Sequence, residues 1–503
     1  MLILSQRLFV STLLFGAALA MGGIACHAAD QPAAAKAAKE EIWNVIYLSG
    51  QRIGHQHSIF ETVSQNGATI IRTSIVTKMT IKRFNQSMVI SQILSADETS
   101  AGDLLRFRYE VANPPAAPSV TSGKIEGEKL TLVQEVNGQA KSKIQSWQAG
   151  LKSPVYQDRV LKDNPLKSGE SRTFQSFIPE YAQAGKATIT GVGLEETKLL
   201  NGVSKRLFKV SCTHSLMPGT IDCFQDEKGD TAKVSMDMVG LKLEMFLVTK
   251  DEALRSLDGT ELDLAINTLV KVKPILKELE TKRVVYRISI TDQNPADVIP
   301  SGITQTIKKV DNRTIELSVV SVPIPATAKP GNVAKEFLES SQYLQRDDEL
   351  VQKHAKRAVG DLTNAAEMAW RMEKYVHEKL NKKNFSTNMA SAGEVAQTME
   401  GDCTEHAVLL AAMLRAKQIP SRIVVGLVYV PTLFAFGCHM WTEANLDGQW
   451  IPLDATLGMR GIGASHIKLG DSSLSDDGPV ALSTFAPLMK VIGNLKVEVI
   501  SAE

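Results

Sequence analysis

Three short segments near the C-terminus carry residue types that could form a catalytic centre. They supply a thiol, an imidazole and a carboxylate, which serve as nucleophile, base and base-orienting group in thiol-dependent acyl transfer. The sequence therefore predicts Cys403, His439 and Asp454 as a catalytic triad. In chain order the segments are Gly401-Asp402-Cys403-Thr404-Glu405-His406, His439-Met440-Trp441-Thr442-Glu443 and Pro452-Leu453-Asp454-Ala455-Thr456.

Cys403 is predicted to begin a helix that runs to Lys417. Asp402, followed three residues later by Glu405, is typical of a capping box and makes Asp402 a supporting residue of the site. Unpaired N–H groups and the helix dipole favour negative charge there, so we expect a lowered pKa for the Cys403 thiol. The same N–H groups could bind an oxyanion. The alternative is a buried structural cysteine at a helix start.

A short turn predicts how the second and third segments meet. Asp447-Gly448 is typical of a two-residue hairpin loop. With these as the central residues, Leu446 pairs with Gln449 and, further along, Trp441 lies opposite Asp454. The turn alone therefore sets a register for the two strands.

Alternation along the strand decides which side chains share a face. His439 and Trp441 lie on one face, so His439 becomes the diagonal neighbour of Asp454, within reach of a hydrogen bond. Cys438 points to the opposite face. This argues against a disulfide between Cys403 and Cys438 unless a β-bulge re-aims one of them.

Two further polar residues are candidates for the site. His406 lies one helical turn beyond Cys403, where we expect a structural role at the helix–sheet junction rather than that of the base. Gln397 could donate a hydrogen bond to an oxyanion, although no spacing rule places it near Cys403.

Composition restricts the class of protein. The chain has 503 residues, 44% hydrophobic and 22% charged, with a net charge of +1. Its length predicts about two to four domains. The balanced charge gives no indication of a surface that binds nucleic acid. We expect a protein or peptide substrate, no metal and no cofactor, because no His, Cys or acidic cluster has convincing ligand spacing. The oligomeric state is left open.

The N-terminus resembles an export signal. Arg7 precedes an apolar run from Leu8 to Ile24, and small residues precede a cleavage point after Ala28. We therefore expect residues 1–28 to be a signal peptide and the mature chain to be periplasmic or extracellular. One alternative is a lipid anchor at Cys26, after a lipobox-like run, and another is an uncleaved anchor. No later segment has the roughly 18–20 apolar residues of a membrane span.

Changes in sequence pattern divide the mature chain. The short alternating runs of the first part predict antiparallel strands, and helical periodicity followed by strands predicts an α+β domain at the C-terminus. The expected order is a linker at 29–41, a β-rich domain at 42–260, a connecting helix and small β segment at 261–330, and the catalytic domain at 331–503.

Two cysteines lie in the β-rich region. Cys212 and Cys223 flank a turn-like stretch, and symmetric pairing of its two arms would place their sulfurs opposite each other. In an oxidising compartment a disulfide could form there. The alternative is two separate, small buried residues.

With these residues established, residues 331 to about 470 resemble the transglutaminase-like superfamily, which has a papain-like catalytic core. The resemblance rests on residues 401–403, Ile419-Pro420-Ser421-Arg422 leading to Gly426, residues 439–443 and residues 454–456. It implies that Cys403 is the nucleophile, that His439 is the general base and acid, and that Asp454 orients His439. It also implies that Trp441 packs beside the site and that Arg422 is structural.

One position departs from the pattern of the superfamily. Gln418 stands where the family commonly has Gly, before Ile419. A left-handed helix end would cost slightly more with Gln than with Gly.

The expected function is cysteine-dependent acyl transfer on protein or peptide amides outside the cytoplasm, ending in cross-linking or hydrolysis. One alternative is a cysteine protease or amidase that only hydrolyses. Another is a catalytically inactive binding or scaffold protein of the cell envelope. A third gives the β-rich region the main role, as a ligand- or envelope-binding domain with the core as accessory.

Overall fold

The computed structural model describes residues 39–503 with short gaps. The expected signal peptide, its Cys26 and most of the expected linker lie outside the described residues, and part of the expected connecting helix does too. No helix among the described residues is long and apolar enough to cross a membrane. The gaps fall at residues 66, 84–85, 115–116, 137, 239–240, 258–267, 276, 279–280, 292, 383–388, 477–483 and 492.

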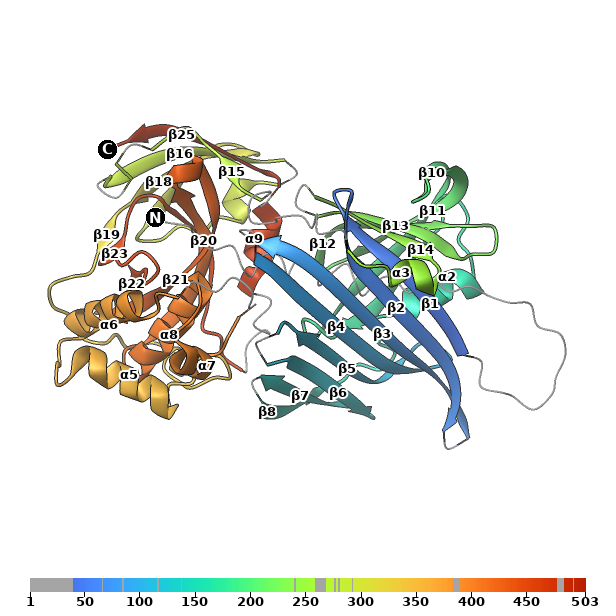
Figure 1. Cartoon of the computed structure of the whole chain (residues 1–503), viewed down its shortest axis with the longest axis horizontal. Helices are drawn as coiled ribbons and strands as arrows, with labels where there is room; N and C mark the ends of the chain where they lie inside the picture. Colours follow the sequence, from blue (N-terminus) through green and yellow to red (C-terminus); the bar gives the residue numbers. More distant parts are fainter. Residues whose placement is uncertain are drawn as a thin grey trace. The chain divides into compact units, whose positions relative to one another are not determined.

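The described chain forms two compact units, one mainly before residue 258 and one from residue 268 onward. Sheet predominates over helix, so the expected α+β description suits the second unit better than the whole chain. The first unit is antiparallel and β-rich, as the alternating sequence predicted. Each unit is described separately below (Figure 1).

One 14-stranded sheet makes up most of the first unit. Neighbouring strands pair in the order β8-β7-β6-β5-β4-β3-β2-β1-β14-β13-β12-β11-β10-β9. Two short helices, α2 (Tyr156–Asp163) and α3 (Lys250–Ala253), accompany it. The strands are β1 (Lys39–Leu48), β2 (Gln51–Gln65), β3 (Ala68–Arg83), β4 (Gln86–Thr99), β5 (Leu104–Ala112), β6 (Ser119–Glu126), β7 (Lys129–Val136), β8 (Gln139–Ser146), β9 (Ser171–Ile178), β10 (Gln183–Lys198), β11 (Ser204–His214), β12 (Met217–Gln225), β13 (Thr231–Met238) and β14 (Leu241–Val248).

The sheet closes on itself through residues 151–153. The N–H of Lys152 donates to the carbonyl of Gln175 on β9 at 2.9 Å, and the N–H of Leu104 on β5 donates to the carbonyl of Leu151 at 3.1 Å. Aromatic packing supports the closure, because the rings of Phe107 and Phe177 lie 5.1 Å apart. Three residues of extended chain therefore join β9 to β5.

The two cysteines of the first unit are diagonal neighbours on paired strands and not directly opposite each other as expected. Cys212 lies opposite Ile221, and Cys223 lies opposite Val210. The expected symmetric register is wrong by two positions. The turn lies at Ser215 and Leu216, since His214 pairs with Met217, and so it precedes the midpoint between the two cysteines; the irregularity between Cys212 and His214 recovers only part of the offset. Both thiols are buried and free. A hydrogen bond to Cys212, together with burial, raises the pKa of the Cys223 thiol well above its usual value.

A buried carboxyl group lies at a small cavity in this unit. Glu180 is 4% exposed, and burial raises the pKa of its carboxyl to about 8. Ser176 and His214 line the same cavity, which has a volume of about 20 Å³. The N–H of Leu216 donates to His214 Nδ1, so His214 Nε2 carries the proton and donates to Ser176 Oγ at 3.1 Å. His214 therefore cannot act as a base toward Ser176 in this tautomer.

The second unit contains the three segments expected to carry chemistry. Helices α5 to α8 gather beside β20 and β21 (Figure 1). One sheet has the order β15-β21-β20-β24, with β22 paired to β21. Its elements are α5 (Glu349–Val359), α6 (Ala365–Lys379), α7 (Ala392–Thr398), α8 (Cys403–Ala416), β15 (Val270–Lys271), β20 (Ser421–Val430), β21 (Ala435–Leu446), β22 (Gln449–Leu453) and β24 (His466–Ser472).

A second sheet joins both ends of this unit. The C-terminal strand β25 pairs with β16, so part of the expected 261–330 segment shares a sheet with the end of the expected 331–503 domain. The remaining elements are β16 (Arg283–Ile290), β17 (Gln305–Asp311), β18 (Thr314–Val320), β19 (Val322–Pro323), β23 (Gly461–Ile462), β25 (Leu495–Ala502), α9 (Ala486–Val491) and short 3₁₀ helices at Pro295–Asp297, Lys335–Phe337 and Pro431–Leu433.

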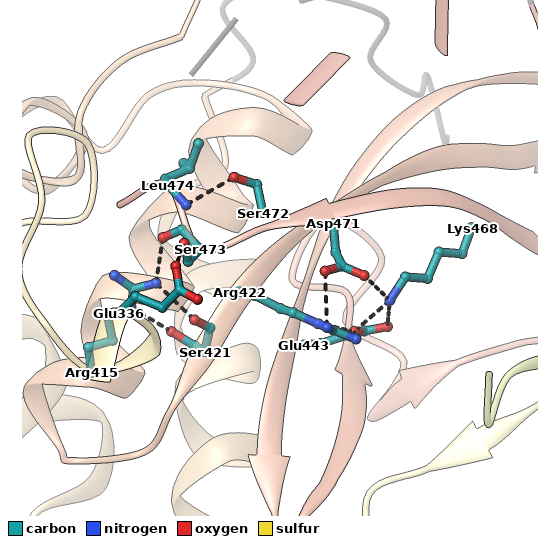
Figure 2. Close-up of polar contacts among 10 residues, drawn as sticks. All are labelled: Glu336, Arg415, Ser421, Arg422, Glu443, Lys468, Asp471, Ser472, Ser473 and Leu474. Atoms are coloured by element: carbon teal, nitrogen blue, oxygen red, sulfur yellow. Dashed lines mark hydrogen bonds and ion pairs between the residues drawn. The ribbon is translucent and has the colours of Figure 1, made fainter. Parts of the chain in front are cut away.

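Helix α8 is the central element of this unit. It packs against α5, α6, α7, β20 and β21, and its residues from Cys403 to Arg415 are all buried. Arg415 fixes its C-terminal end by donating to the carbonyls of Ser421 at 2.9 Å and Ser473 at 2.7 Å (Figure 2). Gln418 then adopts a left-handed conformation with φ of 60°, as the family pattern predicted.

We expect Glu180→Gln to change the pH dependence of stability. The carboxyl group of an unfolded glutamate ionises at about pH 4.3, whereas folded Glu180 keeps its proton up to about pH 8. Folding therefore retains a proton between these values, and wild-type stability should fall by about 1.4 kcal/mol per pH unit because of this group. Urea unfolding should show Glu180→Gln gaining on the wild type as the pH rises. Glu227→Gln, an exposed glutamate of the same unit, is the control, and an equal response of both variants would contradict the prediction.

We expect Gly426→Ala to destabilise the second unit. A Cβ at Gly426 would lie 2.2 Å from the carbonyl oxygen of Ile467 and 2.7 Å from the ring of Trp441. Overpacking of this kind costs about 1–3 kcal/mol, which thermal unfolding would detect. At Gly302 an added Cβ would meet no atom within 4 Å, so Gly302→Ala is the matched control. Equal melting temperatures of the two variants would contradict this packing.

Candidate functional site

Cys403 is the first residue of α8, and a capping box fixes the helix start. The Asp402 side chain accepts a hydrogen bond from the N–H of Thr404 at 3.0 Å, and Glu405 accepts one from the N–H of Asp402 at 2.9 Å. Gly401 has φ of 151°, and a Cβ there would lie 2.3 Å from the Cβ of Glu405. The sequence prediction of the helix start is therefore confirmed, and Cys403 is 2% exposed.

His406 is tied to the same helix start. Its Nδ1 donates to the carbonyl oxygen of Asp402, and the side chain is buried. This contact occupies one ring nitrogen within the first turn of α8. The arrangement matches the structural role that we expected for His406.

The hairpin brings His439 to Asp454. Leu446 pairs with Gln449, and the ladder continues to Thr442 opposite Leu453, which confirms the register predicted from the turn. His439 Nε2 lies 2.7 Å from Oδ2 of Asp454. The predicted contact between imidazole and carboxylate is thus present.

Both side chains of this pair are buried. His439 is 2% exposed and Asp454 is 0% exposed. The second ring nitrogen of His439, Nδ1, is buried and has no hydrogen-bond partner among the described residues. Nε2 of the ring is therefore held by Asp454, and Nδ1 is the nitrogen that can take up a proton.

Four donors surround the Asp454 carboxylate. Oδ2 accepts from His439 and from His466, the latter at 3.0 Å. Oδ1 accepts from the backbone N–H groups of Thr456 at 2.9 Å and Leu457 at 3.2 Å. Burial alone would raise the pKa of Asp454, but the two imidazoles hold it well below its usual value. Asp454 is therefore an ionised carboxylate.

A second acid supports Asp454 from behind. Glu373 on α6 accepts the backbone N–H of Asp454 at 3.0 Å and that of Gly461 at 3.3 Å. Burial raises the pKa of Glu373 to about 8, so at neutral pH this group is mainly protonated. Glu373 thus positions the backbone of Asp454 without adding a second charge.

Sequence reasoning missed His466 and Glu373. His466 lies at the start of β24, which pairs with β20, and no short motif marks it. Burial, despite the carboxylate of Asp454 beside it, lowers the pKa of His466. The sequence signal was a single histidine at a strand start, which alone has no chemical meaning.

Trp441 packs beside His439 as the resemblance implied. The two rings are 6.0 Å apart between centroids at an interplanar angle of 27°. Trp441 lies opposite Val424 and over Gly426, where a side chain would collide with it. Its position therefore depends on the small residue in β20.

A network of paired charged side chains lies on the sheet formed by β20, β21 and β24 (Figure 2). Glu443 accepts from Arg422 at 2.7 Å and from Lys468 at 2.9 Å, and Asp471 pairs with both cations. The Arg422 guanidinium also lies 4.1 Å from the ring centroid of Trp450. Arg422 therefore has the structural partners that the resemblance implied.

Two sequence candidates lie elsewhere. Gln397 is on α7 and is exposed, whereas the predicted triad is buried. Its role as an oxyanion donor stays a prediction. Cys438 is buried on β21 and forms no disulfide among the described residues, and strand alternation directs it away from His439.

Among the described residues, one group of His, Cys and acidic side chains has ligand atoms close enough to share a metal ion. It comprises His439, Asp454 and His466, whose atoms lie within 4.8 Å of one another. The nitrogen–oxygen separations of 2.7 and 3.0 Å are hydrogen-bond distances. Two ligands of a tetrahedral zinc would be about 3.3 Å apart. The geometry thus fits protons better than a metal ion.

Comparison with solved structures gives distant likenesses. A provisionally assigned cysteine protease from Cytophaga hutchinsonii aligns at 18% identity with a TM-score of 0.31, over 44% of this chain and 92% of that one. A beta-barrel-like protein of the domain of unknown function DUF1849 from Brucella abortus aligns at 12% identity with a TM-score of 0.29, over 42% and 95%. A provisionally assigned protease from Parabacteroides distasonis aligns at 13% identity with a TM-score of 0.19, over 73% and 69%. At these scores the likenesses say nothing about function.

Comparison with curated proteins found no match. Comparison with family models did find one, over residues 352–455, which include Cys403, His439 and Asp454. The matched range begins within α5 and ends just after β22, so it covers α8 and the hairpin that together hold these three side chains. The resemblance drawn from the motifs is confirmed over this range: residues 352–455 match the family model of the transglutaminase-like superfamily.

Proposed function

We propose that the second unit is a cysteine-dependent enzyme that acts on amide bonds of proteins or peptides outside the cytoplasm. The observation that carries the proposal is the buried hydrogen bond between His439 and Asp454, in a superfamily core that also places Cys403 at a capped helix start. The export expected from the leader sequence supports the location.

The proposed reaction begins with transfer of the Cys403 thiol proton to His439. Nδ1 of His439 has no hydrogen-bond partner in the part of the chain that the structure describes, while Nε2 is held by Asp454. Asp454 stabilises the imidazolium that forms and keeps the ring oriented. The charge created on the imidazole is thus balanced by a buried carboxylate.

The thiolate then attacks the amide carbonyl carbon, and a carbon–sulfur bond forms. We expect the positive end of the α8 dipole, at which Cys403 lies, to favour the oxyanion that develops on the carbonyl oxygen. As the carbon–nitrogen bond breaks, His439 returns its proton to the amine that leaves. The product of this half-reaction is a thioester on Cys403.

A second nucleophile resolves the thioester. An amine gives a new amide and therefore a cross-link, whereas water gives a carboxylic acid and therefore hydrolysis. Both routes regenerate the Cys403 thiol through the same proton transfers by His439. The alternatives retained are an enzyme that only hydrolyses and an inactive binding protein of the envelope.

Thiol labelling tests the proposed ion pair. We expect iodoacetamide to alkylate Cys403 well below about pH 8, and His439→Ala to shift that profile toward an ordinary thiol of pKa about 8.5. Intact mass and peptide mapping would measure the labelling, with Cys403→Ala as the control. Cys438, a second buried cysteine of the same unit, is an internal reference. Equal labelling of Cys403 and Cys438 at every pH would favour the inactive binding protein.

Asp454→Asn should change stability in acid. The pKa of folded Asp454 lies below the unfolded value of about 3.9, so its ionised form stabilises the fold above about pH 4. That contribution is lost as the pH falls below this value. We therefore expect the difference in unfolding free energy between wild type and Asp454→Asn to be largest near neutral pH and to shrink in acid.

Urea unfolding from about pH 7 to 3 would measure the difference. Asp361→Asn, which changes an exposed aspartate of the same unit, is the matched control. A difference that stays constant across this range would mean that Asp454 is not held ionised by the two imidazoles.

A further inference from the structure

A second histidine contacts the atom of Asp454 that holds His439. His466 Nε2 lies 3.0 Å from Oδ2, the same oxygen that accepts His439 Nε2 at 2.7 Å. Both imidazoles and the carboxylate are fully withdrawn from solvent. Because Asp454 is ionised, it can only accept, so each of these two nitrogens carries a proton and donates.

His466 is held independently of the hairpin. It belongs to β24, which pairs with β20 opposite Val428, whereas His439 and Asp454 come from β21 and the end of β22. Its ring stands edge-on to Trp441 at 5.5 Å and 82°. The donor to Oδ2 is therefore supplied by a separate strand and fixed by an aromatic neighbour.

His466 is not placed to act as a second base. Burial favours its neutral form, and the nitrogen that meets Asp454 already carries a proton. A neutral imidazole that donates to a carboxylate orients that carboxylate without competing for the proton of Cys403.

We propose that His466 is a positioning residue of the site, whose Nε2–H locks Oδ2 of Asp454 in the orientation that receives His439. This proposal rests on the proposed function. Oδ1 accepts from two backbone N–H groups, and a donor at Oδ2 adds a second restraint on rotation of the carboxylate about its Cβ–Cγ bond. His439 gains and loses a proton at Nδ1, so its charge, and with it the strength of its hydrogen bond from Nε2 to Oδ2, changes during the reaction. His466 supplies the constant partner.

Two substitutions at His466 separate the hydrogen bond from packing. The amide nitrogen of Gln can occupy the position of an imidazole Nε2, so His466→Gln should restore the donor. His466→Phe fills the space beside Trp441 without a donor. We expect His466→Phe to slow the alkylation of Cys403 near neutral pH by about tenfold, as loss of a hydrogen bond to a charged group would. We expect His466→Gln to stay within about threefold of the wild type.

The matched control is another buried histidine of the same unit. His354 bonds to the hydroxyl of Tyr375 at 2.8 Å and to the carbonyl of Ala396 at 3.0 Å, away from Asp454. His354→Phe should lower the melting temperature without slowing the labelling of Cys403. Melting curves for all variants would confirm that labelling is measured on folded protein.

Each outcome then has a definite meaning. Slow labelling in His466→Phe with rescue in His466→Gln supports the positioning role. Fast labelling in the wild type and in His466→Phe alike overturns the positioning role and leaves the proposed function standing. Equally slow labelling in both His466 variants also overturns it, because packing rather than the donated hydrogen bond would then matter. Wild-type labelling at the rate of an ordinary thiol overturns the proposed function and this role with it.

Discussion

The buried carboxylate of Asp454 is the constraint on which the site depends. A charged group with no solvent exposure is costly unless its lone pairs are satisfied. Its four donors come from β21, from β24 and from the turn that follows β22. These elements can hold the carboxylate only if all of them are in place together. The polar requirement of one side chain therefore ties three segments of the second unit to a single geometry.

The register of the β21–β22 hairpin determines whether His439 can reach Asp454, and the sequence of the turn sets that register. Asp447 and Gly448 both have positive φ, at 49° and 83°, the combination that a two-residue loop of this kind requires. Because side chains alternate across a strand, a slip of one residue would turn His439 to the opposite face. The position of the turn, and not the identity of the other residues between them, therefore decides that His439 and Asp454 meet across the hairpin.

Local chemistry made the central part of the site predictable, and tertiary pairing hid the rest. The cap at Asp402, the start of α8 at Cys403 and the meeting of His439 with Asp454 depend on residues close in sequence or joined by one turn. His466 reaches Asp454 only because β24 pairs with β20. Glu373 reaches it only because α6 packs on β22. No periodicity in the sequence predicts either of these two contacts with Asp454.

The same distinction explains the first unit. Alternating residues indicated antiparallel strands, but the order of the 14 strands and the closure through residues 151–153 depend on a few distant hydrogen bonds. The register around Cys212 was wrong because the turn lies at Ser215 and Leu216, two residues before the midpoint between the two cysteines. Symmetry about a turn predicts a register only where the turn residues are identified correctly, as Asp447 and Gly448 are in the hairpin of the second unit.

Two acids beside each other also explain how the site keeps a single charge. Glu373 and Asp454 are both buried, yet burial raises the pKa of Glu373 to about 8, while two imidazoles lower that of Asp454. Glu373 has only backbone donors on one oxygen, which do not offset the cost of burying an anion. Asp454 has two imidazoles as well, which do. The number of imidazoles at each acid therefore decides which one is ionised, and places the single negative charge against His439, where a developing imidazolium needs it.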